Sequence, residues 1–158
     1  MLFRSGNLMK EDKSKTVALL NQILETELAG VVRYHHYALM VFGYGRIPIV
    51  SWLRSEANNS LLHAQEAGEL ITSLGGHPSL GICPLLETHK HDIGDILRES
   101  LEHEAKAKSL YLELLDEVKG KSVMLEEYAR QKISEEEMHE GEVNKMLRRP
   151  GEIAAYAT

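Results

Sequence analysis

The chain has 158 residues, enough for one domain with a sizeable core. Its formal net charge of −6 disfavours nucleic acid as the main partner, and its single cysteine, Cys83, excludes an intrachain disulfide framework. No segment is apolar for long enough to cross a bilayer, and Met1 to Gly6 lack the apolar run of a signal peptide. We therefore expect a single domain over residues 1–158, in the cytoplasm, with neither nucleic acid nor a membrane as partner.

Four long segments carry helical periodicity, and glycine or proline separates them. The predicted helices cover residues 14–42, 47–74, 92–119 and 122–149. Asp92 is suited to cap the third helix. Only four prolines and 6% aromatic residues favour an all-α fold over a sandwich or a barrel. The expected bundle spans about residues 14–149, and a loose tail follows over residues 150–158.

The lengths of the connections predict the topology. Short turns at residues 43–46 and at Gly120 make the first two helices, and the last two, antiparallel pairs. A helix of about 27 residues is roughly 40 Å long. The connection from Gly75 to His91 reaches about 55 Å when extended, so it can cross the whole bundle. The sequence therefore predicts a four-helix bundle with one long crossover between its second and third helices, which is the ferritin-like arrangement.

Every predicted helix carries polar residues at mid-length on the stripe that should face the core. These interruptions are Glu27 in the first helix, Glu56, Ser60 and His63 in the second, Glu104 in the third, and Glu136 and His139 in the fourth. Each alone has an ordinary interpretation, as an acid on a solvated face or as a core histidine. A buried carboxylate is costly unless a cation compensates it. One metal cluster at mid-bundle explains all the interruptions with a single cause.

The ligand types narrow the choice of metal. Glu136 and His139 form Glu-x-x-His, a spacing that aims a carboxylate and an imidazole at one point beside a helix. Carboxylates with two imidazoles and no thiolate suit iron or manganese, admit zinc, and disfavour copper(I) and iron–sulfur clusters. Three acids and two histidines exceed the needs of one four-coordinate ion, so we expect two ions.

The chain resembles the bacterioferritins over about residues 20–147. The matching pieces are Leu24-Glu25-Thr26-Glu27-Leu28, His63-Ala64, the turn Leu74-Gly75-Gly76-His77-Pro78, Glu104, and Glu136-Glu137-Met138-His139. The resemblance implies a ferritin-like bundle that oxidises iron(II) at an intrasubunit di-iron centre and stores the product in a hollow oligomer. It also implies the ligands: Glu27 and His63 for one iron, Glu104 and His139 for the other, and Glu136 as a bridge. Tyr34 matches a tyrosine beside the family's centre, which makes it a candidate catalytic residue that is not a ligand.

Three features depart from the family pattern. Ser60 stands where the family has a second bridging glutamate, and Glu56, one turn away on the same stripe, is the expected substitute. Leu61 occupies the position of the family's haem-binding methionine, so we expect no haem. The chain ends soon after Pro150 and Gly151, where bacterioferritins continue into a fifth helix that lines cage channels. We therefore expect a homo-oligomer of at least two subunits, without deciding between a dimer and a closed shell.

Three functions are compatible with these residues, and iron(II) oxidation with iron storage is favoured. The first alternative is a non-storage di-iron oxidoreductase that reduces oxygen or peroxide. The second is a metal-binding or structural subunit with impaired ferroxidase activity. Assembly size separates storage from the first alternative, because storage needs a hollow shell. Iron-dependent consumption of oxygen or peroxide separates both from the second.

Overall fold

The computed structural model describes residues 8–157, which form four α-helices and no β-strand. The helices are α1 (Lys10–Met40), α2 (Arg46–Ser73), α3 (Ile93–Val118) and α4 (Val123–Leu147). Their bounds lie close to the predicted ranges, and the prediction of an all-α fold is confirmed. Met1 to Gly6, on which the expectation of no signal peptide rests, and Thr158 at the end of the tail lie outside the described residues.

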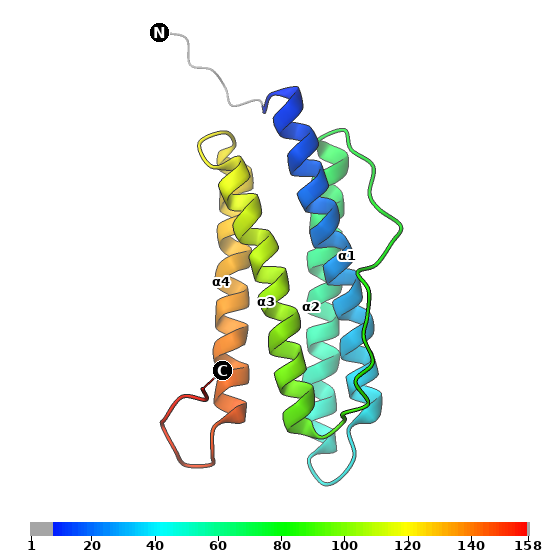
Figure 1. The fold of residues 1–158 in the computed structure, drawn as a ribbon, viewed down its shortest axis with the longest axis vertical. Coiled ribbons are helices and arrows are strands. Elements are labelled where there is room, and N and C mark those ends of the chain that lie inside the picture. The colour runs from blue at the N-terminus through cyan, green and yellow to red at the C-terminus, as the bar shows by residue number, and fades with distance from the viewer. Residues whose placement is uncertain (1–7, 158) are drawn as a thin grey trace.

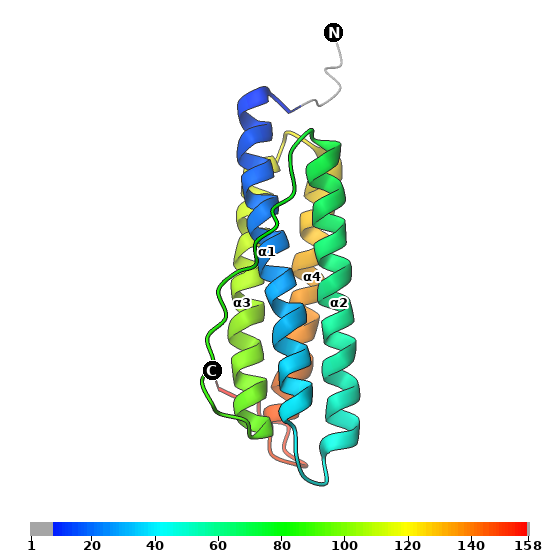
Figure 2. The same cartoon turned by 90° about the vertical axis from the view of Figure 1, so that its right-hand side faces the viewer.

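The four helices form an elongated bundle with one long crossover (Figure 1). Helix α1 packs against α2 and α3, and α3 packs against α4. The connection between α2 and α3 runs the length of the bundle, so α3 begins at the end where α2 began (Figure 1). Figure 2 shows that this crossover lies over α1 and α3. The topology predicted from loop lengths is therefore confirmed.

Local sequence accounts for several helix ends. The side chain of Asp92 accepts a hydrogen bond from the Gly94 amide at 2.8 Å and caps α3, as predicted. Ser122 caps α4 in the same way, with Oγ 3.3 Å from the Leu125 amide nitrogen. Gly75 and Gly120 follow α2 and α3 with φ of 79° and 75°, a conformation that favours glycine.

The core consists of two apolar clusters that leave a polar interval between them. One cluster joins α1, α2, α3 and α4 around Leu20, Ile71 and Leu114. The other joins α1, α2 and α3 around Tyr34, Leu53 and Ile96. Glu27 on α1 and Ser60 and His63 on α2 fall between residues of the two clusters, whereas Glu56 lies beside Leu53 and Ala57 of the second cluster. The fold thus places them at mid-bundle.

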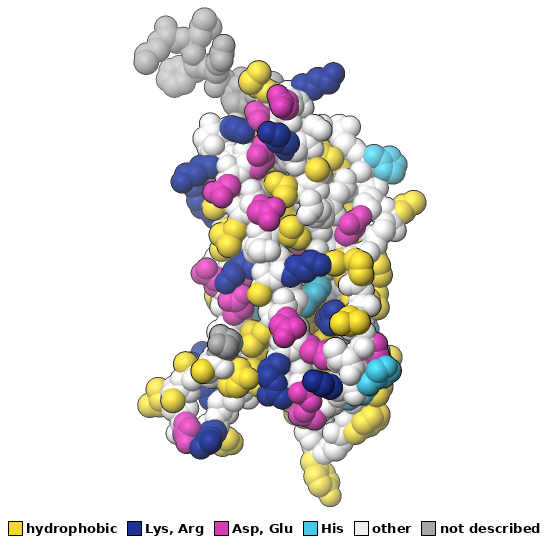
Figure 3. All heavy atoms as spheres, in the orientation of Figure 1, with side chains coloured by type: hydrophobic (Ala, Val, Ile, Leu, Met, Phe, Trp, Pro, Cys, Tyr) yellow, Lys and Arg dark blue, Asp and Glu magenta, His cyan; other side chains and the backbone are white. Residues whose placement is uncertain are grey.

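The surface is mixed in charge, and the end of the chain turns back on α4. Basic and acidic side chains are interspersed on the face shown in Figure 3. No helix within residues 8–157 carries an apolar stretch suited to crossing a membrane.

Beyond α4, the tail that was expected to be loose returns to Asn144. The Asn144 amide group donates to the Tyr156 carbonyl at 2.9 Å and accepts from the Tyr156 amide at 3.2 Å.

Candidate metal centre

Five predicted ligands from four helices meet in one contiguous cluster at mid-bundle. Glu27, Glu104 and Glu136 are 2%, 5% and 4% exposed, and the two histidines are half-buried. The His63 Nδ1 atom lies 3.4 Å from Glu27 Oε1 and 3.7 Å from Glu136 Oε1. The His139 Nε2 atom lies 4.0 Å from Glu104 Oε1. The helical stripes read from the sequence therefore identified side chains that the tertiary structure brings together.

The cluster has two halves, and Glu136 contacts both. In the first half, Glu27, His63 and Glu136 each place one potential ligand atom so that all three atoms lie within 4.8 Å of one another. In the second half, Glu104 lies beside His139 and close enough to Glu136 for that carboxyl group to lower the pKa of Glu104. A carboxylate with this position is suited to bridge two metal ions.

Each histidine of the cluster also contacts an outer carboxylate through the ring nitrogen that faces away from the inner carboxylates. The His63 Nε2 atom lies 3.0 Å from Glu135 Oε2, on the side away from Glu27. The His139 Nδ1 atom lies 2.9 Å from Glu56 Oε2, on the side away from Glu104. Each imidazole thus turns one nitrogen to the inner carboxylates and the other to an outer one. In metal sites this arrangement fixes the tautomer and the orientation of a histidine ligand.

The second helix carries the one departure from the expected ligand set. Glu56 was the expected substitute for a missing bridge, but it lies at the His139 nitrogen that faces away from Glu104. Ser60 is buried, lines the same groove as His63, and approaches the backbone of Gly30. A Cβ atom added to Gly30 would lie 2.9 Å from the Ser60 Oγ. In this geometry Glu56 supports His139 from outside the cluster.

Two buried tyrosines donate hydrogen bonds to the inner carboxylates. The Tyr34 hydroxyl donates to Glu104 and lies 3.4 Å from the His139 Nε2. The Tyr111 hydroxyl donates to Glu27 Oε1 at 2.9 Å. Burial and the neighbouring carboxylates raise the pKa of both phenols well above the ordinary value, so both remain donors. Tyr34 was expected beside the centre, whereas Tyr111 lies on a core stripe that gave no sign of its contact with Glu27.

Burial and neighbouring like charges shift the pKa values of the inner carboxylates. Burial and the adjacent Glu104 raise the pKa of Glu136 to about 12. Burial also opposes ionisation of Glu104, but the hydrogen bond with Glu136 and the charge of His139 outweigh it and lower its pKa. Burial raises the pKa of Glu27, against the opposing effect of His63. A proton on Glu136 therefore provides the compensation that a divalent cation would provide, and such a cation fits this oxygen and imidazole donor set.

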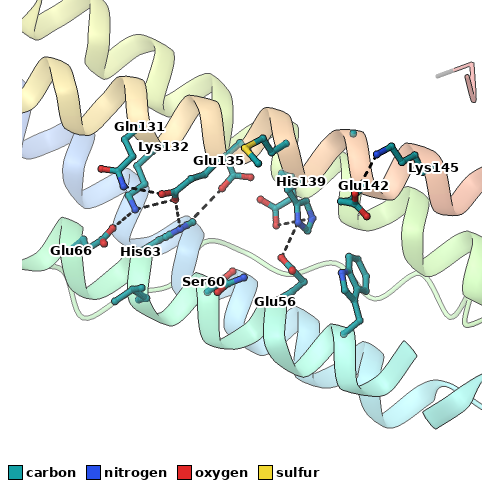
Figure 4. Close-up of a pocket in the computed structure, with 17 residues that line it drawn as sticks. Glu56, Ser60, His63, Glu66, Gln131, Lys132, Glu135, His139, Glu142 and Lys145 are labelled. Carbon is teal, nitrogen blue, oxygen red and sulfur yellow. Dashed lines mark hydrogen bonds and ion pairs between the residues drawn. The ribbon is translucent and has the colours of Figure 1, made fainter. Parts of the chain in front are cut away.

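A groove between α2 and α4 leads from the surface to the cluster. No Cα atom of α2 lies within 8 Å of a Cα atom of α4, and a cavity of about 750 Å³ fills the space between the two helices. Figure 4 shows side chains of α2 and α4 pointing toward each other across it. The Trp52 ring stacks on the His139 imidazole, with centroids 5.8 Å apart and planes at 11°. The groove gives ions a route to the buried carboxylates.

The sequence did not predict the ion pairs that line this groove. Lys132 is only 2% exposed, and its Nζ lies 2.5 Å from Glu66 and 3.1 Å from Glu135 (Figure 4). Lys132 partly neutralises Glu135, which in turn contacts His63. Lys132, Glu135 and Trp52 lie beside the core stripes, where a charged or aromatic residue is not unusual. The only local signal was the position of Glu135 directly before Glu136.

Comparisons with known proteins agree with this architecture. Residues 17–151 match the family model Ferritin, described as a ferritin-like domain. A ferritin-like diiron-carboxylate protein from Bacillus anthracis str. Ames has a TM-score of 0.83 at 23% identity, covering 89% of this chain and 100% of that chain. A dodecameric thioferritin from Bacteroides fragilis, a bacterioferritin-related protein, has a TM-score of 0.79 at 24% identity, covering 85% of each chain.

A third solved structure is a bacterioferritin from Rhodobacter capsulatus, described with a metal-free dinuclear site and a haem iron. It has a TM-score of 0.78 at 23% identity, covering 85% of this chain and 84% of that chain. At these identities the three structures establish a likeness of fold alone. No curated protein sequence matches the chain.

Proposed function

The chain belongs to the ferritin-like domain family, and from that premise we propose that it binds two iron ions at mid-bundle and oxidises iron(II). One observation carries the proposal: two imidazoles turn toward three buried carboxylates, and each is held from behind by an outer carboxylate. Structural packing alone would not need so many ionisable groups in a core, because their burial is costly.

In this proposal the two halves of the cluster hold one ion each. Glu27 and His63 hold the first, Glu104 and His139 hold the second, and Glu136 contacts both. The contacts of Glu136 with His63 and Glu104 support its role as the bridge. Iron(II) bound there would supply electrons for the reduction of oxygen or peroxide. Manganese and zinc are compatible with the same donors.

The surrounding residues prepare the centre for cations. Tyr34 and Tyr111 hold the carboxylates of Glu104 and Glu27 in place through hydrogen bonds. Glu136 must release its proton when a cation binds, so metal affinity rises with pH. The acidic groove attracts cations by electrostatic focusing. Its carboxylates outside the inner cluster are Glu56, Glu66, Glu135 and Glu142.

Iron storage in a homo-oligomer is the finer part of the proposal. Val32 and Leu39 on α1 and Leu61 and Leu62 on α2 are exposed apolar side chains, as expected for helices that meet another subunit.

Ser60 favours the alternative of a metal-binding subunit with impaired ferroxidase activity. Without a carboxylate there, two divalent ions and the three inner glutamates leave about one positive charge uncompensated.

Anaerobic titration with iron(II) by isothermal calorimetry tests the ligand set. The parent should bind two ions per chain, and Glu104→Ala and Glu136→Ala should each lose at least one. Glu102→Ala and Glu137→Ala are matched controls, because these exposed acids lie on the same two helices. Equal binding by the parent and the two ligand variants would refute the proposal.

Two further measurements on the same purified protein separate the candidate functions. Stopped-flow absorbance after mixing with oxygen or peroxide measures iron oxidation, which a purely metal-binding subunit would lack. Light scattering gives the assembly mass. A hollow multimer that retains mineralised iron supports storage, whereas rapid turnover by a dimer supports the non-storage oxidoreductase.

A further inference from the structure

A second cluster of metal-binding side chains lies where the crossover passes α1. His36 is on α1, while Glu87 and His91 are on the crossover just before α3. The His36 Nε2 atom lies 2.7 Å from Glu87 Oε2, and the His91 Nε2 atom lies 3.4 Å from Glu87 Oε1. One potential ligand atom from each residue lies within 4.8 Å of the others. Three donors separated in sequence thus converge on one point.

The imidazole nitrogens that face this point both contact the carboxylate of Glu87. The Nε2 atoms of His36 and His91 are shielded from solvent, and neither makes a well-aligned hydrogen bond within the described residues 8–157. A shielded nitrogen that is poorly aligned with its partner is only partly compensated for its desolvation. Each of the two atoms lies within ion-pair distance of one oxygen of the Glu87 carboxylate. A cation between the three groups would satisfy all of them.

We propose that His36, Glu87 and His91 bind one divalent transition metal ion of the zinc class, which fastens the crossover to α1. Two imidazoles and one carboxylate, with water as a fourth ligand, form a usual set for zinc. Tetrahedral bonds of about 2.0–2.2 Å require ligand atoms roughly 3.3 Å apart. The two nitrogens lie 2.7 and 3.4 Å from the Glu87 oxygens, so rotation of the side chains would bring the three ligand atoms to this spacing. The half-exposed position leaves room for the water.

The local backbone directs the carboxylate toward this site. The His89 amide donates to Glu87 Oε1 at 2.7 Å, and His89 has φ of 58°, in the left-handed region. The rings of His36 and His91 are 5.9 Å apart between centroids, edge to face, which leaves both Nε2 atoms beside the carboxylate. Figure 2 shows the crossover over α1 and α3, whereas the groove to the central cluster opens between α2 and α4. The two sites are therefore separate and would be loaded independently.

Metal at this site would change the behaviour of the crossover. The ion would join a helix residue to two residues of a long loop, which restrains the segment that leads into α3. Because the ligands converge only in the folded chain, binding would also stabilise the fold by mass action. The proposal is independent of iron oxidation at the central cluster.

Zinc binding by the full-length protein tests the proposal. We would titrate the parent, His36→Ala, His91→Ala and the control His35→Ala with Zn²⁺ alone in a calorimeter. His35 is exposed and precedes His36, so its removal changes the histidine content of the same helix without touching the cluster. The expected result is one bound Zn²⁺ fewer per chain in His36→Ala and His91→Ala than in the parent and in His35→Ala. Equal zinc stoichiometry in all four proteins would overturn the proposal.

A second readout locates the ion on the crossover. Limited proteolysis within residues 74–92 should slow in the presence of Zn²⁺ for the parent and for His35→Ala, but not for His91→Ala. The Glu136→Ala background removes the proposed central bridge and should leave this protection intact. If protection depends on Glu136 and not on His91, zinc acts through the central cluster and the crossover site is rejected. Circular dichroism of each variant checks that the helices are retained.

Discussion

Glu56 on α2 and His139 on α4 lie 2.9 Å apart across the groove, with Glu56 Oε2 facing the Nδ1 atom of the imidazole (Figure 4). The other ring nitrogen faces Tyr34 and Glu104. The carboxylate therefore lies behind the proposed ligand, on the side away from the inner cluster. This position distinguishes a residue that orients His139 from one that binds the metal itself.

Replacing Glu56 with alanine should weaken metal binding without removing an ion. Loss of a partner behind a histidine ligand typically lowers metal affinity by about 10–100-fold. We therefore expect Glu56→Ala to bind two ions at saturation but with reduced affinity, as measured by anaerobic calorimetry. Glu56→Gln, which keeps a hydrogen-bond acceptor, should lose less. Saturation at one ion per chain would show instead that Glu56 is a ligand.

Ser60→Glu should tighten binding of the second ion and speed iron(II) oxidation. Position 60 lies on α2 one turn before His63 and lines the same groove, so a glutamate there adds an oxygen donor to the centre. Its negative charge would also balance the two cations. Repacking against Gly30 should cost about 1–3 kcal/mol of metal-free stability. Stopped-flow oxidation at two iron equivalents per chain measures the effect, and a fast parent with no gain in the variant would contradict it.

Gly30→Ala should destabilise the protein although alanine favours helices. The added Cβ atom would lie 2.9 Å from both the Ser60 Oγ and the His103 Nε2. Overpacking of this kind costs about 1–3 kcal/mol, against a propensity gain of about 1 kcal/mol. The control is Gly68→Ala on α2, where a Cβ meets no atom within 4 Å and stability should rise. Urea denaturation gives the change in the free energy of unfolding for each variant. An equal increase in both would contradict the close contact at Gly30.

The metal-free protein should lose stability as pH rises from about 7 to 9. The folded chain keeps the Glu136 proton up to a pKa of about 12, while the unfolded chain releases it near 4.5. A raised folded pKa gives stability that is complete below the unfolded pKa and is lost as pH rises through the folded pKa. Each retained proton removes about 1.4 kcal/mol per pH unit in this window.

Three other groups of the cluster also have raised pKa values and also lower the stability of the metal-free protein as pH rises. The pKa of Glu27 is raised by burial, and hydrogen bonds with carboxylates raise the pKa of His63 and of His139 despite the opposing effect of burial. Glu136→Gln removes one of these protons and should flatten the dependence. Thermal unfolding in chelator at several pH values provides the measurement. A melting temperature that rises with pH in the parent would show that Glu136 is ionised in the folded protein.

Bound metal should reverse the dependence of thermal stability on pH. Divalent ions displace the cluster's protons, so the increase in melting temperature caused by excess manganese should grow with pH. Manganese avoids the complication of oxidation during heating. In Glu104→Ala the increase should be smaller, because one half of the centre has lost its carboxylate ligand while Glu27 and His63 remain. A parent that gains no thermal stability from manganese would contradict a resident cation site.

The sequence alone determined the helices, the crossover and the inner members of the cluster. Helical periodicity specifies which side chains share a face, so the spacing of apolar residues by itself assigns Glu27, His63, Glu104 and Glu136 to core stripes. The length of the connection between α2 and α3 was sufficient to predict the topology. These features depend on spacing along one helix or on chain length, which are local properties.

Only the tertiary structure decided how side chains of different helices meet. It placed Glu56 and Glu135 behind the two histidines, and it buried Lys132 between two carboxylates. It also brought His36 to a loop segment far along the chain. Helical spacing does not specify the distance between two helices or the rotation of a side chain at their interface. Both depend on how all four helices pack, which sets the α2–α4 groove and the contacts across it.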